Sequence, residues 1–485
     1  MRIKKIFCLI LIIELTGCGL WGPDYVKPKI SHSDKWRSND SSTISGGDTD
    51  ISSVAWWTQF NDVQLNNLIK DALKNNNNIQ QAVGNIIQAK GYLEQVKYSW
   101  IPTLSSNQGY SSSNSFSSQL NNQTASATIG GNTGYSVGLI PSYSLNVLQL
   151  LRTQEAAKAS LMQVRYTKNA LRLTVLSQIV GSYFTLIQQK YLLDLQNHLV
   201  QENLDIYNLA NQQYKENYIS LFTLQNYYQI YEASKAQIPI LENNITQTEN
   251  AIQVLINKSP AKVITGSKFE NISTSGIIPV NLPSSVLKFR PDVMAAEEQL
   301  IVANANIGVA TSFYFPTLSL TTGVGSATTT LTNLFQGTDS FWQIKSFVNL
   351  PFAFSQFGQI KSAKGAYYSA YYNYANTIRI ALQQVDTGLS AHQTLSDNYK
   401  DLLSFYESVK VSYNLSVESF TQGYYNKLQE LTVKVQLDNA SISLANAKLQ
   451  QLQSIVNLYQ ALAGGYNVNN TEKENIFGDA RDSSK

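Results

Sequence analysis

The chain has 485 residues, a formal net charge of +3 and only 14 % charged residues. A balance this close to neutral excludes nucleic acid and other polyanions as partners recognised by bulk charge. Because about 25 % charged residues is usual in soluble proteins, the polar surface here is built from Asn, Gln, Ser and Thr, together with 28 tyrosines.

The first 17 residues have the form of a lipoprotein signal peptide. A positively charged start is followed by the apolar stretch Ile6–Ile13 and by the sequence Leu-Thr-Gly-Cys, which ends at Cys18. This pattern predicts removal of residues 1–17 and attachment of lipid to Cys18, which would hold the mature chain to a membrane. The alternative is an ordinary secretory signal in which Cys18 is incidental. The other cysteine, Cys8, lies in the leader, so the mature chain has no disulfide.

The phrase Pro-Thr-Leu-Ser occurs twice, at Pro102 and at Pro316. Each copy follows a stretch with helical character, and each precedes a Ser/Thr/Gly-rich stretch and a second short segment that contains a proline, Pro141 or Pro351. More than a hundred residues of helix-forming sequence follow in both halves. The pattern predicts one duplicated unit with loops of different length, and these four prolines are interpreted as helix-to-strand junctions. The helical stretches before Pro102 and Pro316 are expected over Leu65–Tyr98 and Pro283–Phe313.

The short segments are interpreted as membrane strands. No run of eighteen apolar residues follows the leader, so a crossing would have to use strands. Hairpins are expected at about 103–145 and about 317–354, the second with alternating Leu318, Leu320 and Val324. An exposed soluble hairpin or a disordered loop is the alternative for the weaker first hairpin. Four strands are too few to close a barrel, which needs about eight, so several chains must share one.

The long helical stretches have a coiled-coil pattern. From Leu173 onward apolar residues recur at steps of three and four, and Glu202 is the one polar member of this seam. The stretch Arg152–Asn217 would form a helix about 100 Å long. The seam breaks at about residue 217 and again at about 423, where turns are expected. Each half therefore reads as helix, hairpin, long helix, turn, helix.

Four pieces of the chain together resemble a known family. They are the Leu-Thr-Gly-Cys lipobox, GPDYVKP (22–28), WWTQFNDVQLNNLIKDALKNN (56–76) and LPSSVLKFRPDVMAAEEQLIVANANIGVATSFYFPTLSL (282–320). The chain is similar to TolC-like outer-membrane factors of tripartite efflux, in the lipoprotein branch that works with resistance-nodulation-division pumps. The resemblance implies an α+β fold in which a long α-helical coiled-coil barrel joins a transmembrane β-barrel shared between protomers, four strands each.

The resemblance also implies the organisation of the chain and its partners. A lipid-anchored homotrimer would lie in the outer membrane of a Gram-negative bacterium, with a large periplasmic part that meets a periplasmic adaptor, or membrane fusion protein, and an inner-membrane pump. The expected segments are the leader 1–17, a lipidated and equatorial segment 18–60, a first repeat 61–260, an equatorial linker 261–283, a second repeat 284–465 and a tail 466–485.

Two groups of residues match functional positions of that family. The inter-helix turns that would meet the adaptor are Asn217, Tyr218, Gly423 and Tyr424. A periplasmic gate is expected at Tyr214, Asn226, Tyr425, Gln429, Glu430 and Thr432, and Tyr218 and Tyr424 are gate candidates as well. The family often has aspartates in this gate, whereas Asn226, Gln429 and Thr432 are neutral here, so neutral hydrogen bonds would close the aperture. The alternative is that the tyrosines are solvated turn residues without a gating role.

Catalysis is not expected. His32, His198 and His392 are far apart in sequence, no metal-ligand spacing occurs, and Glu297 and Glu298 are adjacent and so do not share a helix face. No cofactor is expected beyond the covalent lipid on Cys18. The predicted function is therefore an exit duct that passively conducts cargo, which could be a drug, a metal, a detergent or a peptide. The alternative is a pump-independent porin-like or structural outer-membrane lipoprotein.

Overall fold

A computed structural model of the protein describes residues 22–30, 51–112, 133–274, 288–328, 330–336, 340–351 and 353–468. Cys18, the leader and residues 469–485 lie outside the described residues. The chain forms two compact units: the first is drawn from Met1–Lys29, Asn85–Val164 and Ala295–Ala375, and the second from Ile30–Gly84, Arg165–Met294 and Asn376–Lys485.

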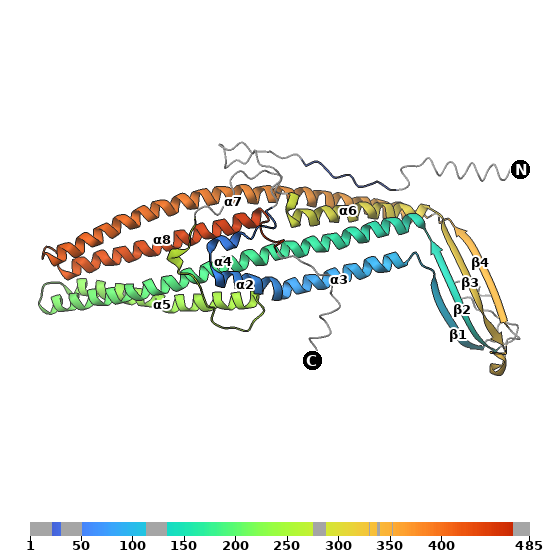
Figure 1. The fold of residues 1–485 in the computed structure, drawn as a ribbon, viewed down its shortest axis with the longest axis horizontal. Helices are drawn as coiled ribbons and strands as arrows, with labels where there is room; N and C mark the ends of the chain where they lie inside the picture. Colours follow the sequence, from blue (N-terminus) through green and yellow to red (C-terminus); the bar gives the residue numbers. More distant parts are fainter. Residues whose placement is uncertain are drawn as a thin grey trace. The chain divides into compact units, whose positions relative to one another are not determined.

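The same order of elements occurs twice, as predicted (Figure 1). The first copy comprises α3 (Asn77–Tyr98), β1 (Thr103–Ser112), β2 (Thr133–Leu145), α4 (Val147–Lys215) and α5 (Leu221–Leu255). The second comprises α6 (Pro291–Thr311), β3 (Thr317–Thr328), β4 (Ser340–Asn349), α7 (Ser355–Thr421) and α8 (Lys427–Ala461). The matched helices have nearly equal lengths, with 69 and 67 residues in α4 and α7 and 35 residues in both α5 and α8.

The expected single helix before Pro102 is in fact two helices, α2 (Val63–Asn75) and α3. The break falls at Asn76, whose backbone is extended with ψ 125°. Its side-chain oxygen accepts the N–H groups of Asn78 and Ile79, and its amide donates to the Leu255 carbonyl. Asn76 therefore begins a new helix with a side-chain cap, which is why a proline was not needed to end the preceding one.

The four strands form one antiparallel sheet in the order β1-β2-β3-β4 (Figure 1). Thr103 pairs with Ser142, Leu145 with Leu318, and Leu318 with Val348. Each strand lies beside the strand that precedes or follows it in the chain, and β2 of the first repeat pairs with β3 of the second. The sheet thus joins the two repeats within the first unit, next to a small helix core of Ile86, Leu93, Val96, Ala157 and Leu161.

An N-terminal strap, residues 22–27, lies along α6 in the first unit. Gly22 has φ +76°, and a Cβ added to it would lie 2.6 Å from the Gly308 Cα. Asn304 donates to the Pro23 carbonyl, and both Tyr25 and Lys27 contact the Glu297 carboxylate. The strap is thus held by one close backbone approach and by polar contacts. From α4, Arg152 adds an ion pair to Asp24 at 2.8 Å.

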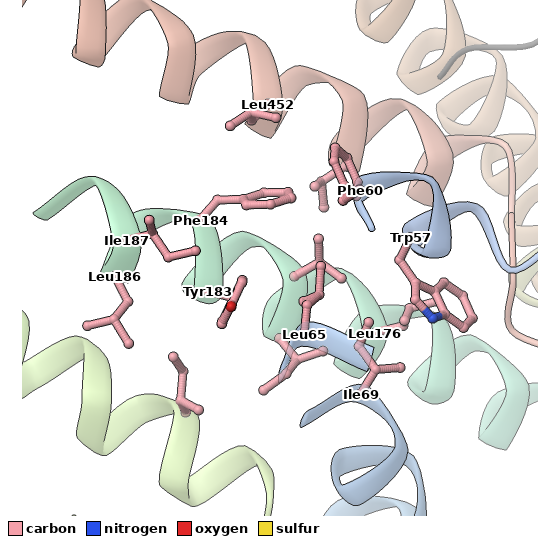
Figure 2. Close-up of a cluster of buried hydrophobic side chains, with 14 of the residues drawn as sticks. Trp57, Phe60, Leu65, Ile69, Leu176, Tyr183, Phe184, Leu186, Ile187 and Leu452 are labelled. Carbon is pink, nitrogen blue, oxygen red and sulfur yellow. The ribbon is translucent and has the colours of Figure 1, made fainter. Parts of the chain in front are cut away.

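The main core lies in the second unit, where the short 3-10 helix η1 (Trp56–Phe60) and α2 pack against α4, α5 and α8 (Figure 2). Trp56 is 1 % exposed and stacks on Tyr459 with ring centroids 4.5 Å apart. In the described part of the chain, α4 alone is long and apolar enough to cross a membrane, but 61 % of its apolar 18-residue segment is buried inside the protein. It is therefore the central helix of this core. The core side chains labelled in Figure 2 are Trp57, Phe60, Leu65, Ile69, Leu176, Tyr183, Phe184, Leu186, Ile187 and Leu452.

Two helical hairpins, α4–α5 and α7–α8, extend from this core within the second unit. Gln196 of α4 donates to the Ser234 carbonyl of α5, and Gln451 of α8 donates to the Ser396 hydroxyl of α7. The hairpins also contact each other, since Gln188 of α4 donates to Asn446 of α8. Amide and hydroxyl side chains make these contacts, in keeping with the low charge of the chain.

Candidate functional site

One face of the four-stranded sheet is apolar and exposed. The cross-strand pairs Leu318–Val348 and Val324–Trp342 lie on it. Trp342 is 78 % exposed and Val348 is 66 % exposed. The register places further large side chains on the same face, namely Leu104, Tyr110, Tyr135, Leu139, Tyr143, Leu320 and Ile344. Water would not favour so much exposed apolar surface, whereas the hydrocarbon of a membrane would.

The opposite face of the sheet is mostly polar or small. It carries Ser105, Asn107, Ser136 and Ser319, and Lys345 pairs there with Thr321. The strands have 10, 13, 12 and 10 residues, and about 9 to 11 residues are enough for a tilted strand to cross a bilayer. The sheet therefore has the length and the two-sided pattern of a segment of membrane barrel.

Three of the four expected junction prolines lie where helix and strand meet. Pro102 directly precedes β1, Pro316 directly precedes β3, and Pro351 lies between β4 and α7. Pro141 differs, because it lies inside β2 opposite Leu104. Its missing N–H leaves a gap in the pairing of β2 with β3, which stops at Leu139 and resumes at Ser142. The β2 strand continues past its proline and ends at Leu145, just before α4.

The two hairpin turns have the same backbone geometry. Asn217 and Gly423 have φ +59° and +82°, the left-handed conformation that commonly ends helices. In each turn the next N–H reaches back five residues, from Tyr218 to the Gln213 carbonyl and from Tyr424 to the Ser419 carbonyl, both at 2.8 Å. Tyr218 and Tyr424 are consequently the most exposed tyrosines of the turns, at 80 % and 79 %.

Three of the gate candidates are engaged within α8 itself. Gln429 forms a capping box with Asn426 at the start of the helix. Glu430 is 6 % exposed and pairs with Lys427, and the Thr432 hydroxyl donates to the Leu428 carbonyl. At least one polar atom of each of these three side chains thus already has a partner in a single chain. Of the other candidates, Tyr214, Asn226 and Tyr425 are at least partly exposed.

A buried polar node that the sequence did not reveal lies at the start of α2. Asp62 is 3 % exposed. One carboxylate oxygen accepts the N–H groups of Gln64 and Leu65, and the other accepts the Tyr183 hydroxyl at 2.7 Å and the Ser267 N–H at 3.0 Å. Burial alone would raise the pKa of Asp62, but these hydrogen bonds outweigh burial and lower it. The node ties α2, α4 and the segment after α5 together.

A second buried node explains the Arg-Pro-Asp sequence at the start of α6. Arg290 is 5 % exposed and donates to both Asp292 oxygens, to the Gln384 side chain and to the Ala461 carbonyl. The last contact satisfies a carbonyl in the final turn of α8, which has no partner in its own helix. Arg290 therefore joins α6, α7 and α8 in the second unit.

The described residues offer no catalytic or metal centre. No group of three or more His, Cys, Asp or Glu side chains in this part of the chain could hold a metal ion. His392 lies between Ser396 and Ser454, and burial lowers its pKa. His198 lies on α4, and His32 lies outside the described residues. A packed or surface histidine is a structural feature and not a reaction centre.

Comparison with known proteins agrees with this geometry. The chain is 24 % identical over 466 residues to the cation efflux system protein CusC of Escherichia coli K12, covering 95 % of this chain and 98 % of the relative. It is 25 % identical over 474 residues to the toluene efflux pump outer membrane protein TtgI of Pseudomonas putida, covering 94 % and 97 %. Both are outer-membrane efflux proteins or parts of efflux systems by name.

Solved structures show the same fold. The outer membrane channel MtrE of Neisseria gonorrhoeae, crystallised in its open state, matches with a TM-score of 0.79 and 25 % identity over 92 % of this chain and 98 % of the other. The outer membrane channel CmeC of Campylobacter jejuni matches with a TM-score of 0.78 and 23 % identity over 94 % and 97 %. Residues 68–258 and 282–464 match the outer membrane efflux protein family, one match for each repeat. This chain therefore belongs to the outer membrane efflux protein family, whose members are channels of the Gram-negative outer membrane and not enzymes.

Proposed function

We propose that this protein is the exit duct of a tripartite efflux system, in which three copies share one barrel and one helical tunnel. The observation that carries this proposal is the four-stranded sheet, which is apolar on one face and has β1 and β4 at its edges. Unpaired backbone groups at such edges are too costly in lipid, and four strands cannot close on themselves. A ring in which β1 of each copy pairs with β4 of the next satisfies both edges.

Chain geometry favours three copies over two. Two copies would contribute about eight strands, and an eight-stranded barrel has an interior that side chains fill. Three copies contribute about twelve, so the polar face of the sheet can line a wider lumen. The exposed apolar face with Trp342 and Val348 would then contact the lipid of the outer membrane.

Lipid attachment at Cys18 is part of the proposal. The strap begins at Gly22, four residues after Cys18, and its contacts with Gly308 and Glu297 are within the first unit. A chain acylated at Cys18 would thus be fastened to the membrane next to the unit that holds the sheet. Replacing Cys18 with Ser should abolish incorporation of labelled palmitate, and incorporation that persists would contradict lipidation at this residue.

The hairpin turns are the proposed contact with a periplasmic adaptor. The turns at Asn217 and Gly423 share one backbone geometry and each exposes a tyrosine, so one adaptor surface could bind both. Cargo would be delivered by an inner-membrane pump and would not be selected by the duct. In support, one relative is named for cations and another for toluene, and the chain has few charges.

Single-channel conductance of the purified mature protein in a planar bilayer tests the duct. We expect a nearly closed wild type and a wide, steady opening in Tyr218→Ala/Tyr424→Ala. Tyr92→Ala, at an exposed tyrosine of α3 outside both hairpins, is the matched control and should behave as wild type. An open wild type would contradict the gate at the turns. No conductance in any variant would favour the structural lipoprotein.

Dependence on a pump needs a separate test. If the chain is an efflux duct, it should co-purify with an adaptor protein, and its deletion should reduce tolerance to toxic compounds in the host. Asn217→Pro/Gly423→Pro changes both turns and should weaken co-purification while the trimer mass is kept. Conductance without adaptor binding or a tolerance phenotype would instead indicate a porin-like protein.

A further inference from the structure

Three ionisable side chains meet between the two helical hairpins. Glu202 of α4 faces Lys434 and Asp438, which are one turn apart on α8. The Lys434 Nζ lies 3.4 Å from Glu202 Oε1 and 2.8 Å from Asp438 Oδ1. The Asp438 side chain is 4 % exposed and the Glu202 side chain 14 % exposed. One ammonium group therefore serves two carboxyl groups that water hardly reaches.

The second oxygen of each carboxyl group is buried and accepts no hydrogen bond. These oxygens are Glu202 Oε2 and Asp438 Oδ2, although the two side chains lie within hydrogen-bonding reach of each other. Two ionised carboxylates have only acceptors and cannot bond to each other, whereas a protonated carboxyl group can donate to an ionised one. A single proton held between Glu202 and Asp438 would let one of these carboxyl groups donate to the other. It also leaves one negative charge to balance Lys434.

Around this cluster the described residues include tyrosines, carboxylates and, one turn before Glu202 on α4, the exposed His198. From α7 the ring of Tyr413 lies 5.6 Å from Lys434 Nζ. On α5, Lys235 pairs with Glu232. The charge of Asp438 also reaches Tyr191 of α4, which in turn lies near Glu270 and Tyr406. Burial, followed by the neighbouring Asp438, raises the pKa of Glu202 to about 8, although Lys434 acts in the opposite direction.

We propose that Glu202, Lys434 and Asp438 form a proton clamp that holds the α4–α5 and α7–α8 hairpins together through one shared proton, and that loss of this proton opens the hairpin end of the duct. The opening of the duct by loss of the proton rests on the proposed function. Glu202 lies 13 residues before the end of α4, about 20 Å from the turn. A change of contact there acts on the part of both hairpins that carries the gate candidates.

The direction of the pH effect follows from the raised pKa of Glu202. Between the pKa of an unfolded Glu, about 4.3, and a value of about 8, the clamped state holds a proton that the free side chain has lost. The clamp therefore weakens steadily as pH rises through this range, and the weakening is complete above it. Above that range two carboxylates face one ammonium, and their repulsion separates the hairpins.

Spin-label distances between the hairpins test the clamp directly. The mature chain has no cysteine besides Cys18, so spin labels can be attached at Asn208→Cys on α4 and Gln436→Cys on α8, both exposed positions. Labelled chains are diluted with unlabelled ones, so that the measured distance is the one within a single chain. We expect the distance to lengthen by a few ångström as pH rises and the change to be complete a little above pH 8, the pKa of Glu202 in the clamped state. A distance that stays constant from about pH 6 to 10 would overturn the clamp.

Glu202→Gln supplies the decisive variant, because its amide can donate to Asp438 as the protonated acid does but cannot titrate. It should keep the short distance at every pH. Asp194→Asn removes an exposed carboxylate from the same helix and should leave the pH dependence as in wild type. A Glu202→Gln protein that still lengthens with pH would refute the shared proton. If Glu202→Gln fails to form trimers, Asp438→Asn tests the same prediction.

Conductance measured over the same pH range separates the clamp from the duct. We expect conductance to increase several-fold across the pH at which the distance lengthens, and not in Glu202→Gln. A lengthening distance with unchanged, non-zero conductance would overturn the control of opening by the clamp. A lengthening distance with no conductance at any pH would overturn the duct and leave the clamp supported.

Discussion

Replacing Tyr183 with Phe should destabilise the protein more than the loss of one hydroxyl group usually does. The Tyr183 hydroxyl donates to Asp62 Oδ2 at 2.7 Å and accepts the Gly266 N–H at 3.0 Å. A hydrogen bond to a charged group contributes about 1.5–3 kcal/mol, whereas Gly266 is exposed and its N–H can bond to water in the variant. Because Asp62 keeps its three backbone donors, we expect a loss of about 2 kcal/mol in the free energy of unfolding.

The effect should also depend on pH in a defined direction. The pKa of Asp62 is lowered in the folded protein, so its contribution to stability is present above the pKa of an unfolded Asp and is lost as pH falls through the folded value. The bond from Tyr183 is strong only while Asp62 is ionised. The difference between wild type and Tyr183→Phe should therefore be constant near neutral pH and shrink in acid.

Urea unfolding in mild detergent, followed by circular dichroism, measures this difference. Tyr207→Phe is the matched control, because Tyr207 lies on the same helix and packs against Tyr228 and Tyr231 through its ring. It should change stability by less than about 0.5 kcal/mol. If Tyr183→Phe is no worse than Tyr207→Phe, or if its effect is the same at every pH, the node at Asp62 does not work as described.

Three further predictions follow from other contacts. Arg290→Lys cannot reproduce the forked contact with Asp292 and the bond to the Ala461 carbonyl, and it should lower the free energy of unfolding by about 2–4 kcal/mol. Arg379→Lys, at an exposed position of α7, is the control and should leave the free energy of unfolding unchanged. Equal effects of the two variants in urea unfolding would contradict the node at Arg290. Gly22→Ala would place a Cβ 2.6 Å from the Gly308 Cα at a φ of +76°, so the strap should detach and trypsin should cut faster after Lys29; an unchanged rate would show that the strap does not depend on this approach. Asn426→Ala removes the capping box of α8 and should cost about 1 kcal/mol, seen as faster hydrogen exchange in the first turn of α8 and nowhere else.

The fold could be predicted from the sequence wherever it depends on local pattern. The repeated Pro-Thr-Leu-Ser phrase and the alternation from Leu318 to Val324 predicted the duplicated order and the sheet, because helix and strand periodicity appear within a few residues. The helix break at Asn76 was missed because a single side chain makes it. The position of Pro141 was wrong for a related reason, since a strand can continue past a proline where one ladder omits its bonds.

Polar contacts between distant parts of the chain could not be predicted from sequence patterns. Lys27 and Glu297 are 270 residues apart in the chain, and no local period links them. Glu202 did give a signal, as the one polar member of an apolar seam, but its partners on α8 appear only in the fold. The roles expected for the turn and gate residues remain predictions. Gln429 is already engaged in the cap of α8, so it has fewer polar atoms left with which to close an aperture.

The contact of Gly22 with Gly308 also limits the depth at which the protein can lie in a bilayer. Gly308 lies three residues before α6 ends at Thr311, and Cys18 precedes Gly22 by four residues. An extended chain covers about 3.5 Å per residue, so if Cys18 is acylated as we propose, the residue that carries the lipid lies within about 14 Å of the last turn of α6. The acyl chains would thus fix how deeply the protein is immersed in the bilayer. Inserting a few residues between Cys18 and Gly22 would let the protein lie at a different depth in the bilayer without changing any contact of its fold.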